Sequence, residues 1–563
     1  MDWSGSVFEP VPAQPPQMRW WGWGEDDHAG GLPPQAQAFL DEHLGTAAAP
    51  RPPVDLEQVR IEPSSLPQDA RAELAGILGG GQVRDDRYER VLHAAGKGYP
   101  DLVRMRAGTP EGAPDAVLHP ASHEQIRAVL ELCSAQSLAV VPFGGGTSVV
   151  GGVAPLRGTH QAVLALDMAG VAGISSLDAE SATVTVGAGM RAPALERELA
   201  AHGLTLGHYP QSYEYVSLGG CAATRSAGQA STGYGAIDKM VLGLRLAAPA
   251  AEIVLAPVPA SAAGPGLRQL LVGSEGTLGV ISEVSLRVRP APRSEVYEGV
   301  FFENFDAGRE AFRTLAREHA LPDVARLSDE AETRMSMALA GEGGLKGRLG
   351  RRYLGLRGYG SGCVAIVGFE GGESEVAARR RRALHLMRRR GGLPVGTSPG
   401  RAWRHGRFAA PYLRDELLGL GVMVETLETA TQWSNVAGLH LGVTRAIERS
   451  LASQGTPGLV MCHISHVYET GASLYFTFLA RQLEGREVEQ WRLAKQAASE
   501  AISSGGGTIT HHHAVGRDHA PWMDREIGAG GLAVLRAVKS ELDPMGVMNP
   551  GKLLEGTAVA ATL

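Results

Sequence analysis

The sequence contains 563 residues, of which 44% are hydrophobic and 20% charged, so large cores can form and a disordered or collagen-like chain is excluded. The 53 Lys and Arg against 60 Asp and Glu give a net charge of −7, which leaves no overall positive field for nucleic acid. The four cysteines form no C-x-x-C pair, no basic-then-apolar leader is present, and no apolar run reaches about 18 residues. We therefore expect a cytoplasmic, multidomain globular protein with reduced thiols.

Residues 1–85 are predicted to form an N-terminal arm with helices. Up to about residue 55 the chain is rich in Pro, Ala and Gln, which is typical of extended segments. Trp3, Trp20, Trp21 and Trp23 stand among the charged residues of this stretch. We expect these tryptophans to anchor the arm on the body of the protein.

Residues 86–291 combine helical patterns with short apolar runs. A helix is predicted from His123, followed by a strand from Leu138 to Pro142 and then a glycine-rich loop. Further strands are predicted near residues 162–168, 182–190, 240–248 and 280–290. Pro290 and Pro292 mark the predicted end of this domain.

Residues 292–535 repeat strand, helix and strand at longer spacing, and then place two strands in succession, at 458–468 and 472–480. This order favours an antiparallel sheet covered on one face by helices. The last segment, 536–563, starts as a helix that ends at Pro544 and is predicted to pack back on the first domain. The predicted fold class is α+β.

A glycine loop follows the strand that starts at Leu138. Its residues are Pro142, Phe143, Gly144, Gly145, Gly146, Thr147 and Ser148. Three glycines let backbone N–H groups approach a ligand, and the two hydroxyls add donors, which suits a pyrophosphate. A tight hairpin turn is the alternative. The loop contains neither G-x-G-x-x-G nor G-K-[ST], so the nicotinamide and ATP loops are not supported.

Two more segments, 208–229 and 273–281, follow the glycine loop, and together the three closely resemble the FAD-binding domain of vanillyl-alcohol-oxidase-type flavoproteins. The resemblance implies a two-lobed FAD-binding domain with an antiparallel-sheet cap domain. It implies non-covalent FAD, because Thr147-Ser148 stands where covalent relatives carry histidine and no cysteine follows His208-Tyr-Pro. The implied FAD-binding residues are those of the glycine loop together with His208, Gln211, Ser212, Tyr213, Glu214, Tyr215, Val216, Ser217, Gly219, Gly220, Thr224, Arg225, Ser226, Ala227, Glu275, Gly276, Thr277, Leu278, Gly279, Val280 and Ile281.

Within that superfamily the chain most resembles the alkyldihydroxyacetonephosphate synthase family, in segments spread over nearly its whole length. These segments are 18–24, 326–329, 411–415, 425–429, 471–475 and 510–516. The resemblance implies exchange of the acyl group of 1-acyl-dihydroxyacetone phosphate for a long-chain alcohol through an adduct at flavin N5, as in ether-lipid synthesis. It also implies a homodimer.

The family resemblance assigns roles to single residues. Arg414 corresponds to the arginine that holds the substrate phosphate, whereas the sequence alone favours an exposed pair with Asp415. Tyr475 corresponds to the catalytic tyrosine, whereas its strand neighbours suggest a core aromatic. Arg326 is implied near the flavin, with a salt bridge to Asp329 as the alternative. Thr426, like His208 and Ser217, matches positions around the flavin or substrate.

Three consecutive histidines, His511, His512 and His513, follow a strand-like run at 507–510. Alternation would put the first and third on one face, and imidazoles suit proton transfer or metal binding. Related 2-hydroxyacid dehydrogenases bind a metal through two cap-strand histidines and an acid. Here Tyr475 and His512 stand where the second histidine and the acid would be, so we expect no metal site, and His463 and His466 are predicted to be structural.

Two basic stretches, 345–358 and the arginine-rich helix containing 379–382 and 388–390, could contact an anionic membrane or be solvated surface. The first, a glycine-rich loop, favours peripheral contact with the inner membrane face. An FAD-dependent oxidase or dehydrogenase of a 2-hydroxyacid or alcohol is the alternative function. A flavin-free lipid-binding scaffold is disfavoured by the intact glycine loop.

Overall fold

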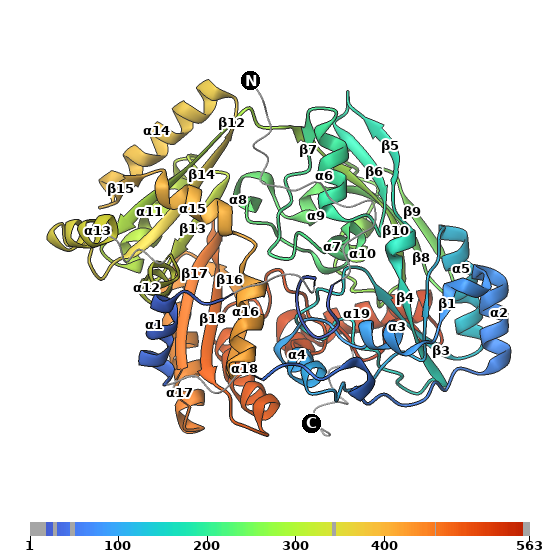
Figure 1. Cartoon of the computed structure of the whole chain (residues 1–563). Coiled ribbons are helices and arrows are strands. Elements are labelled where there is room, and N and C mark those ends of the chain that lie inside the picture. The colour runs from blue at the N-terminus through green and yellow to red at the C-terminus, as the bar shows by residue number, and fades with distance from the viewer. Residues whose placement is uncertain (1–17, 26–30, 46–50, 341–344, 457, 555–563) are drawn as a thin grey trace.

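The computed structural model describes residues 18–25, 31–45, 51–340, 345–456 and 458–554. The chain folds into two bodies that lie side by side (Figure 1). One contains most of the blue and green segments with the red C-terminal helix, and the other contains the yellow and orange segments. Trp3 lies outside the described residues, whereas Trp20 and Trp23 are buried as anchors.

The first lobe of the FAD-binding body is a small, mainly parallel sheet. Its strands, in spatial order, are β1 (Val83–Arg84), β2 (Ala116–Leu118), β4 (Ala162–Asp167) and β3 (Leu138–Phe143). Helix α5 (His123–Ala135) buries its apolar positions in the core of this body and starts where the Ser122 hydroxyl accepts from the Gln125 N–H. The other helices of this region are α2 (Gln68–Leu78), α3 (Arg87–Leu92) and α4 (Tyr99–Arg106).

The second lobe is an antiparallel sheet ordered β5 (Ile174–Asp178), β6 (Thr183–Gly187), β10 (Val280–Arg287), β8 (Val241–Ala247) and β9 (Glu252–Leu255). Short elements around it are α6 (Ala192–Ala200), β7 (Leu204–Thr205), α7 (Leu218–Thr224), α8 (Ser231–Tyr234), α9 (Ile237–Met240), α10 (Leu267–Leu271) and β11 (Arg289–Pro290). After α19 (Met523–Leu542), Val547 and Asn549 form backbone hydrogen bonds with Val140 in β3. Residues 547–549 therefore pack against the strand that precedes the glycine loop.

The cap body is built on one antiparallel seven-stranded sheet. Its order is β15 (Leu393–Gly396), β12 (Ser294–Phe302), β14 (Cys363–Gly371), β13 (Val324–Ser328), β17 (Gly458–Val467), β18 (Gly471–Arg481) and β16 (Val422–Gln432). Along β18, Leu474, Phe476 and Phe478 enter a core shared with the helices on one face. These helices are α11 (Phe305–Arg317), α14 (Glu373–Arg389), α17 (Val436–Ser453) and α18 (Glu487–Ser504). The predicted α+β class with an antiparallel cap is confirmed.

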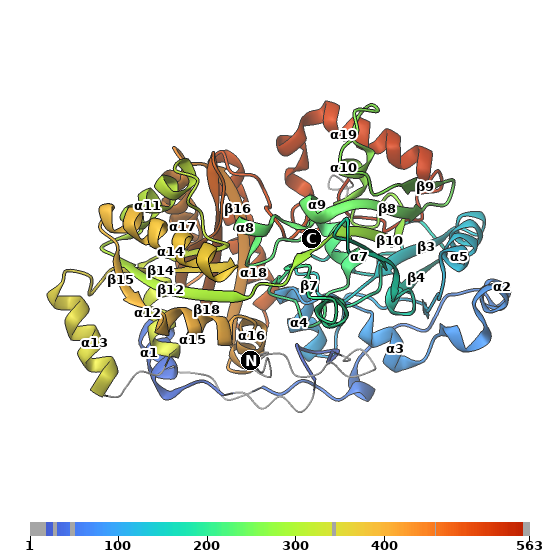
Figure 2. The same cartoon turned by 90° about the horizontal axis from the view of Figure 1, so that it is seen from above.

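The opposite face of the cap sheet carries α12 (Glu330–Leu339) and α16 (Ala410–Gly419), and α1 (Pro34–Leu44) packs on the same region. Helix α15 (Ser398–Gly406) packs on β12. Residues 345–356, predicted as a loop, form helix α13 (Leu345–Leu356), at the outer end of the cap away from the FAD-binding body (Figure 2). Among the described helices, none is both long and apolar enough to cross a membrane.

Candidate functional site

A cavity of about 510 Å³ lies between the FAD-binding body and the cap. On the FAD-binding side, most residues predicted to bind FAD line it. They are Pro142, Phe143, Gly144, Gly145, Gly146, Thr147, Ser148, Gln211, Ser212, Val216, Ser217, Gly219, Gly220, Thr224, Ser226, Ala227, Glu275, Gly276, Gly279, Val280 and Ile281. From the cap, Arg326, Arg414, Thr426, Tyr475, His512 and His513 line the same cavity.

The glycine loop has the form that a pyrophosphate requires. In the described part of the chain, the N–H groups of residues 145–148 donate to no acceptor. A Cβ on Gly144 would lie 2.3 Å from the Ser217 Oγ, and one on Gly145 would lie 2.1 Å from the Tyr215 carbonyl oxygen. Because β3 pairs in parallel with β4, the loop is not a hairpin turn. Free backbone donors on a close-packed loop fit the diphosphate of FAD.

Seven of the predicted FAD-binding residues lie outside the cavity wall: His208, Tyr213, Glu214, Tyr215, Arg225, Thr277 and Leu278. His208 is buried 3.3 Å from the Ser226 Oγ, and burial lowers its pKa to about 4, so it is neutral. Arg225 donates to the Gln269 side chain and carbonyl. Tyr215 packs edge-on against Trp23, with ring centroids 5.3 Å apart. His208 and Tyr215 thus lie against two residues of the wall, Ser226 and Gly145.

Tyr475 occupies the centre of the cap face. In the sheet register it lies between His463 on β17 and Glu428 on β16, and its ring stacks on His463 with centroids 4.8 Å apart. Burial raises the pKa of Tyr475 to about 12, although a hydrogen bond with the Thr426 side chain lowers it in part. The phenol is therefore protonated at neutral pH and can act as a proton donor.

Arg326 lines the cavity in a charge network with Glu332 and His463, and it does not form the alternative salt bridge with Asp329. Its Nη2 donates to Glu332 Oε1 at 2.9 Å, and its Nη1 lies 3.0 Å from His463 Nε2. Burial raises the pKa of Glu332, but Arg326 and His463 together lower it to about 2. Asp329 instead accepts from the N–H groups of Glu332 and Cys462. His463, predicted to be structural, lines the cavity between Arg326 and Tyr475.

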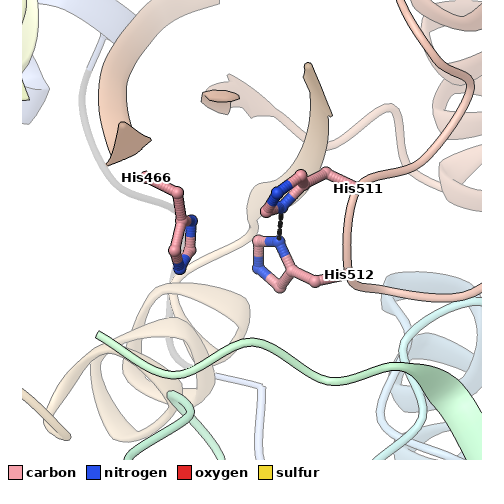
Figure 3. Close-up of side chains that lie close together, drawn as sticks. All are labelled: His466, His511 and His512. Carbon is pink, nitrogen blue, oxygen red and sulfur yellow. Dashed lines mark hydrogen bonds between the residues drawn. The ribbon is translucent and has the colours of Figure 1, made fainter. Parts of the chain in front are cut away.

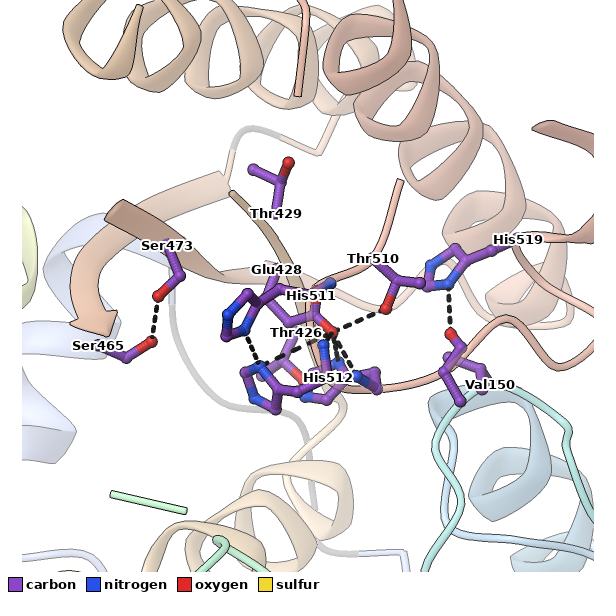
Figure 4. Close-up of polar contacts among 12 residues, drawn as sticks. Val150, Thr426, Glu428, Thr429, Ser465, Ser473, Thr510, His511, His512 and His519 are labelled. Atoms are coloured by element: carbon purple, nitrogen blue, oxygen red, sulfur yellow. Dashed lines mark hydrogen bonds and ion pairs between the residues drawn. The ribbon is translucent and has the colours of Figure 1, made fainter. Parts of the chain in front are cut away.

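The three histidines lie on a loop that Glu428 organises, not on the extended strand that the sequence predicted (Figure 4). Glu428 is fully buried. Its Oε1 accepts from the His512 N–H at 2.8 Å, from the His513 N–H and from the Thr510 hydroxyl at 2.9 Å, and its Oε2 accepts from the His511 N–H at 2.7 Å. Burial raises the pKa of Glu428, but the histidines and these N–H groups lower it far more, so it stays ionised.

A second carboxylate holds the other end of this loop from the FAD-binding body. Glu275, predicted to contact FAD, accepts from the Val515 N–H at 2.8 Å and from the Gly516 N–H at 2.7 Å. Burial raises its pKa to about 7, against the effect of these two donors. The histidine loop is thus tied to both bodies. This role of Glu428 was not predicted from the sequence, because the only signal there was a carboxylate within the 425–429 segment. The contact with residues 510–513 joins segments about 80 residues apart, which no local pattern reveals.

His466 lies beside the first two histidines of the loop (Figure 3). The Nδ1 atoms of His511 and His512 are 2.8 Å apart, and the Tyr468 hydroxyl lies 2.6 Å from His511 Nε2. His466, His511 and His512 each offer a nitrogen within 4.8 Å of the others, which the sequence pattern did not anticipate. His466 Nε2 already donates to the Gly228 carbonyl, and its Nδ1 accepts from the Ser465 hydroxyl. Burial lowers the pKa of His466 to about 3 and lowers those of His511, His512 and His513.

Arg414 projects from α16 into the cavity wall. Its Nη1 donates to the Lys97 carbonyl at 2.7 Å, whereas its Nε and Nη2 are buried without a hydrogen-bond acceptor among the described residues. Asp415 Oδ1 lies 3.6 Å from Nε, at ion-pair distance but beyond a hydrogen bond. Its side chain is 14% exposed and that of Asp415 is 8% exposed, so this is not an exposed surface pair. Two unmatched guanidinium N–H groups at a cavity point to an anionic ligand.

Beyond Arg414 the cavity wall is apolar. Its residues there are Met335, Leu339, Leu413, Leu417, Val424, Met461 and Leu479. They belong to one hydrophobic cluster that also contains Leu40 and Leu44 of α1. The site therefore joins a glycine-loop cradle, a polar centre, a cationic point and an apolar arm.

Comparisons with known proteins agree with this geometry. Residues 114–256 match the family model described as an FAD binding domain, and residues 291–553 match that of the FAD linked oxidases, C-terminal domain. An alkyldihydroxyacetonephosphate synthase of Trypanosoma brucei brucei is 32% identical, covering 96% of this chain and 92% of the relative. The alkyldihydroxyacetonephosphate synthase of Dictyostelium discoideum is 31% identical, covering 89% of this chain and 83% of the relative. A solved alkyldihydroxyacetonephosphate synthase structure superposes with a TM-score of 0.83 at 28% identity, covering 95% of this chain and 98% of its own.

Proposed function

This chain belongs to the alkyldihydroxyacetonephosphate synthase family of FAD-binding enzymes, and we propose that it exchanges the acyl group of 1-acyl-dihydroxyacetone phosphate for a long-chain fatty alcohol. One observation carries the proposal: a single cavity joins the unpaired donors of Arg414 to the Tyr475 centre and to an apolar arm. These three parts match a phosphate, a reacting carbon and a hydrocarbon chain. FAD held non-covalently on the glycine loop completes the site.

When bound on the glycine loop, FAD in its oxidised form would supply an electrophilic N5 toward C1 of the dihydroxyacetone unit, the carbon that the carboxylate leaves and the alcohol enters. Arg414 would bind the phosphate and so fix the position of C1. Tyr475, whose phenol is protonated at neutral pH, would give a proton at that carbon, and it would take one there only after passing its own proton to a neighbouring base. His512 and His513, kept neutral by burial, lie next to Tyr475 and would accept the proton.

The decisive experiment mixes the purified yellow protein with palmitoyl-dihydroxyacetone phosphate without oxygen and follows flavin absorbance, and then adds hexadecanol. Bleaching that recovers with the alcohol, with alkyl product and free palmitate, is the expected result. Bleaching only with a hydroxyacid or alcohol, and recovery only with an electron acceptor, would instead establish the oxidase or dehydrogenase alternative. That alternative is kept because residues 291–553 match the FAD linked oxidases.

Substitution of Arg414 tests the phosphate contact. Arg414→Ala should raise the KM for palmitoyl-dihydroxyacetone phosphate about 100-fold, because two charge-assisted hydrogen bonds are lost. FAD content should stay the same, and Arg414→Lys should recover only part of the loss since it cannot offer a fork. An unchanged KM in Arg414→Ala would remove this residue from the site.

Peripheral membrane contact and a homodimer complete the proposal. Helix α13 exposes Leu349, Tyr353 and Leu356, the last 79% exposed, next to Arg352 and Arg357. Such a basic amphipathic surface can bind anionic lipid. On α14, by contrast, Arg379 pairs with Asp323 and Arg380 with Glu298, which is typical of structural positions. The protein should bind phosphatidylserine vesicles but not phosphatidylcholine vesicles, and the double variant Leu349→Asp with Leu356→Asp should lose this binding. Light scattering tests the dimer.

A further inference from the structure

Three buried N–H donors without a hydrogen-bond acceptor belong to two residues that line the cavity and that Asp415 connects, Trp23 and Arg414. Two are the Nε and Nη2 of Arg414, and the third is the indole Nε1 of Trp23, a residue that is only 2% exposed and lines the cavity. None has an acceptor among the described residues. A buried donor without a partner costs about 1–3 kcal/mol, and a group of donors with no acceptor is matched by an anion.

Trp23 belongs to residues 18–24, here called the N-terminal strap, and the strap is fastened beside Arg414. The Asp415 carboxylate accepts from the Trp23 backbone N–H, and Arg19 Nε donates to the Trp23 carbonyl at 3.1 Å. The flanking glycines permit this close fit. A Cβ on Gly22 would lie 2.5 Å from Asp415 Oδ2, and one on Gly24, where φ is +78°, would lie 2.4 Å from the Tyr412 ring.

Lys97 joins the strap, the glycine loop and Arg414. Its Nζ donates to the Arg19 carbonyl at 2.8 Å, its N–H donates to the Ser148 carbonyl at 2.6 Å, and its own carbonyl accepts from Arg414. Burial lowers the pKa of Lys97 to about 7; Asp415 and Asp101 raise it, and Arg414 and Arg19 lower it further. A bound anion would add negative charge to a group in which Asp415 and Asp101 face three cations, Lys97, Arg414 and Arg19.

We propose that the Trp23 indole is a ligand of the substrate phosphate, donating its N–H beside Arg414, and that Lys97 positions the strap. This inference rests on the proposed function, because the anion it assigns is the phosphate of the acyl substrate. The strap is then a working part of the substrate site and not only an anchor of the N-terminal region.

The test uses Trp23→Phe, which keeps an aromatic ring against Tyr215 and removes only the donor. The KM for palmitoyl-dihydroxyacetone phosphate should rise about tenfold, the size of one hydrogen bond to a charged group. The KM for hexadecanol and the FAD content should stay within twofold of the unchanged enzyme. Trp21→Phe is the matched control, since Trp21 lies over Arg19 and Arg106 and does not line the cavity. Equal KM values in Trp23→Phe and Trp21→Phe would overturn the proposal.

A binding measurement separates this inference from the proposed reaction. sn-Glycerol 3-phosphate should raise the Tm of the FAD-loaded wild-type and Trp21→Phe proteins by the same amount, and it should raise the Tm of Trp23→Phe by less. Glycerol, which lacks the phosphate, should raise the Tm of none of the three proteins. This pattern supports the phosphate contact even if the wild type fails to turn over the acyl substrate, in which case only the proposed function fails. In the wild type, the indole ¹⁵N–¹H resonance that is absent from Trp23→Phe should shift on adding the phosphate. If this wild-type resonance does not shift under saturating sn-glycerol 3-phosphate, the contact is refuted. This outcome is read in the wild type, so it does not depend on the stability of Trp23→Phe.

Discussion

Replacing Glu428 with glutamine removes one negative charge and turns one acceptor oxygen into a donor. Glu428 accepts three backbone N–H groups and one hydroxyl, so the amide nitrogen of glutamine must face at least one donor. One orphaned buried N–H costs about 1–3 kcal/mol, and weaker bonds to the remaining donors add about 0.5–1 kcal/mol each. The total, about 4 kcal/mol, is enough to displace the loop that carries the histidines.

The assay for Glu428→Gln is steady-state turnover over a range of pH, with FAD content measured in parallel. A displacement of the histidines by about 1 Å should lower kcat about 100-fold while FAD remains bound. The charge of Glu428 raises the pKa of His512 and His513, so its removal should move the acid limb of the pH profile to lower pH. Thr429→Val is the control, because the Thr429 hydroxyl holds the Thr508 carbonyl and not the histidines. Lower stability with an unchanged kcat and acid limb would refute the catalytic role of this loop.

Three further outcomes are expected. Tyr475→Phe should abolish turnover while the protein stays yellow, and retained turnover would exclude Tyr475 as the proton-transfer group. His466 has a pKa of about 3 in the folded protein against about 6.5 when unfolded, so only the unfolded state binds the proton between these values; stability should fall by about 1.4 kcal/mol per pH unit below 6.5. Between pH 7.5 and 5.5, the free energy of unfolding should fall by about 1.4 kcal/mol less in His466→Gln than in the wild type. An equal fall in both proteins would contradict a neutral His466 in the folded state. Met335→Trp should fill the apolar arm and shift preference to shorter acyl chains, and an unchanged chain-length profile would place the chain elsewhere.

Local patterns predicted the elements of this fold well, but they did not predict the polar partners. The helix from His123, the strand from Leu138 and the glycine loop were all predicted where they occur, because hydrophobic period and turn residues are local. The partners of Arg326 depend on the pairing of β13 with β17, which sets His463 beside it and leaves Asp329 to accept from backbone N–H groups. The prediction of a strand at 507–510 was wrong for the same reason. Thr510 and His511 donate to Glu428, which lies on the distant strand β16, and these bonds hold the segment as a loop.

The two carboxylates explain how neutral imidazoles can sit beside a buried negative charge. An ionised Glu428 next to His512 and His513 would by itself favour their protonation, and its nearest imidazole nitrogen is His513 Nδ1, at 3.7 Å. Its hydrogen bonds come instead from backbone N–H groups and the Thr510 hydroxyl, which stabilise the carboxylate without carrying a proton that titrates near neutral pH. Burial then outweighs the remaining attraction and lowers the pKa of both imidazoles. The loop can therefore present proton acceptors to Tyr475 while it is held in place by a charge, and Glu275 fixes its far end from the FAD-binding body so that this geometry depends on both bodies.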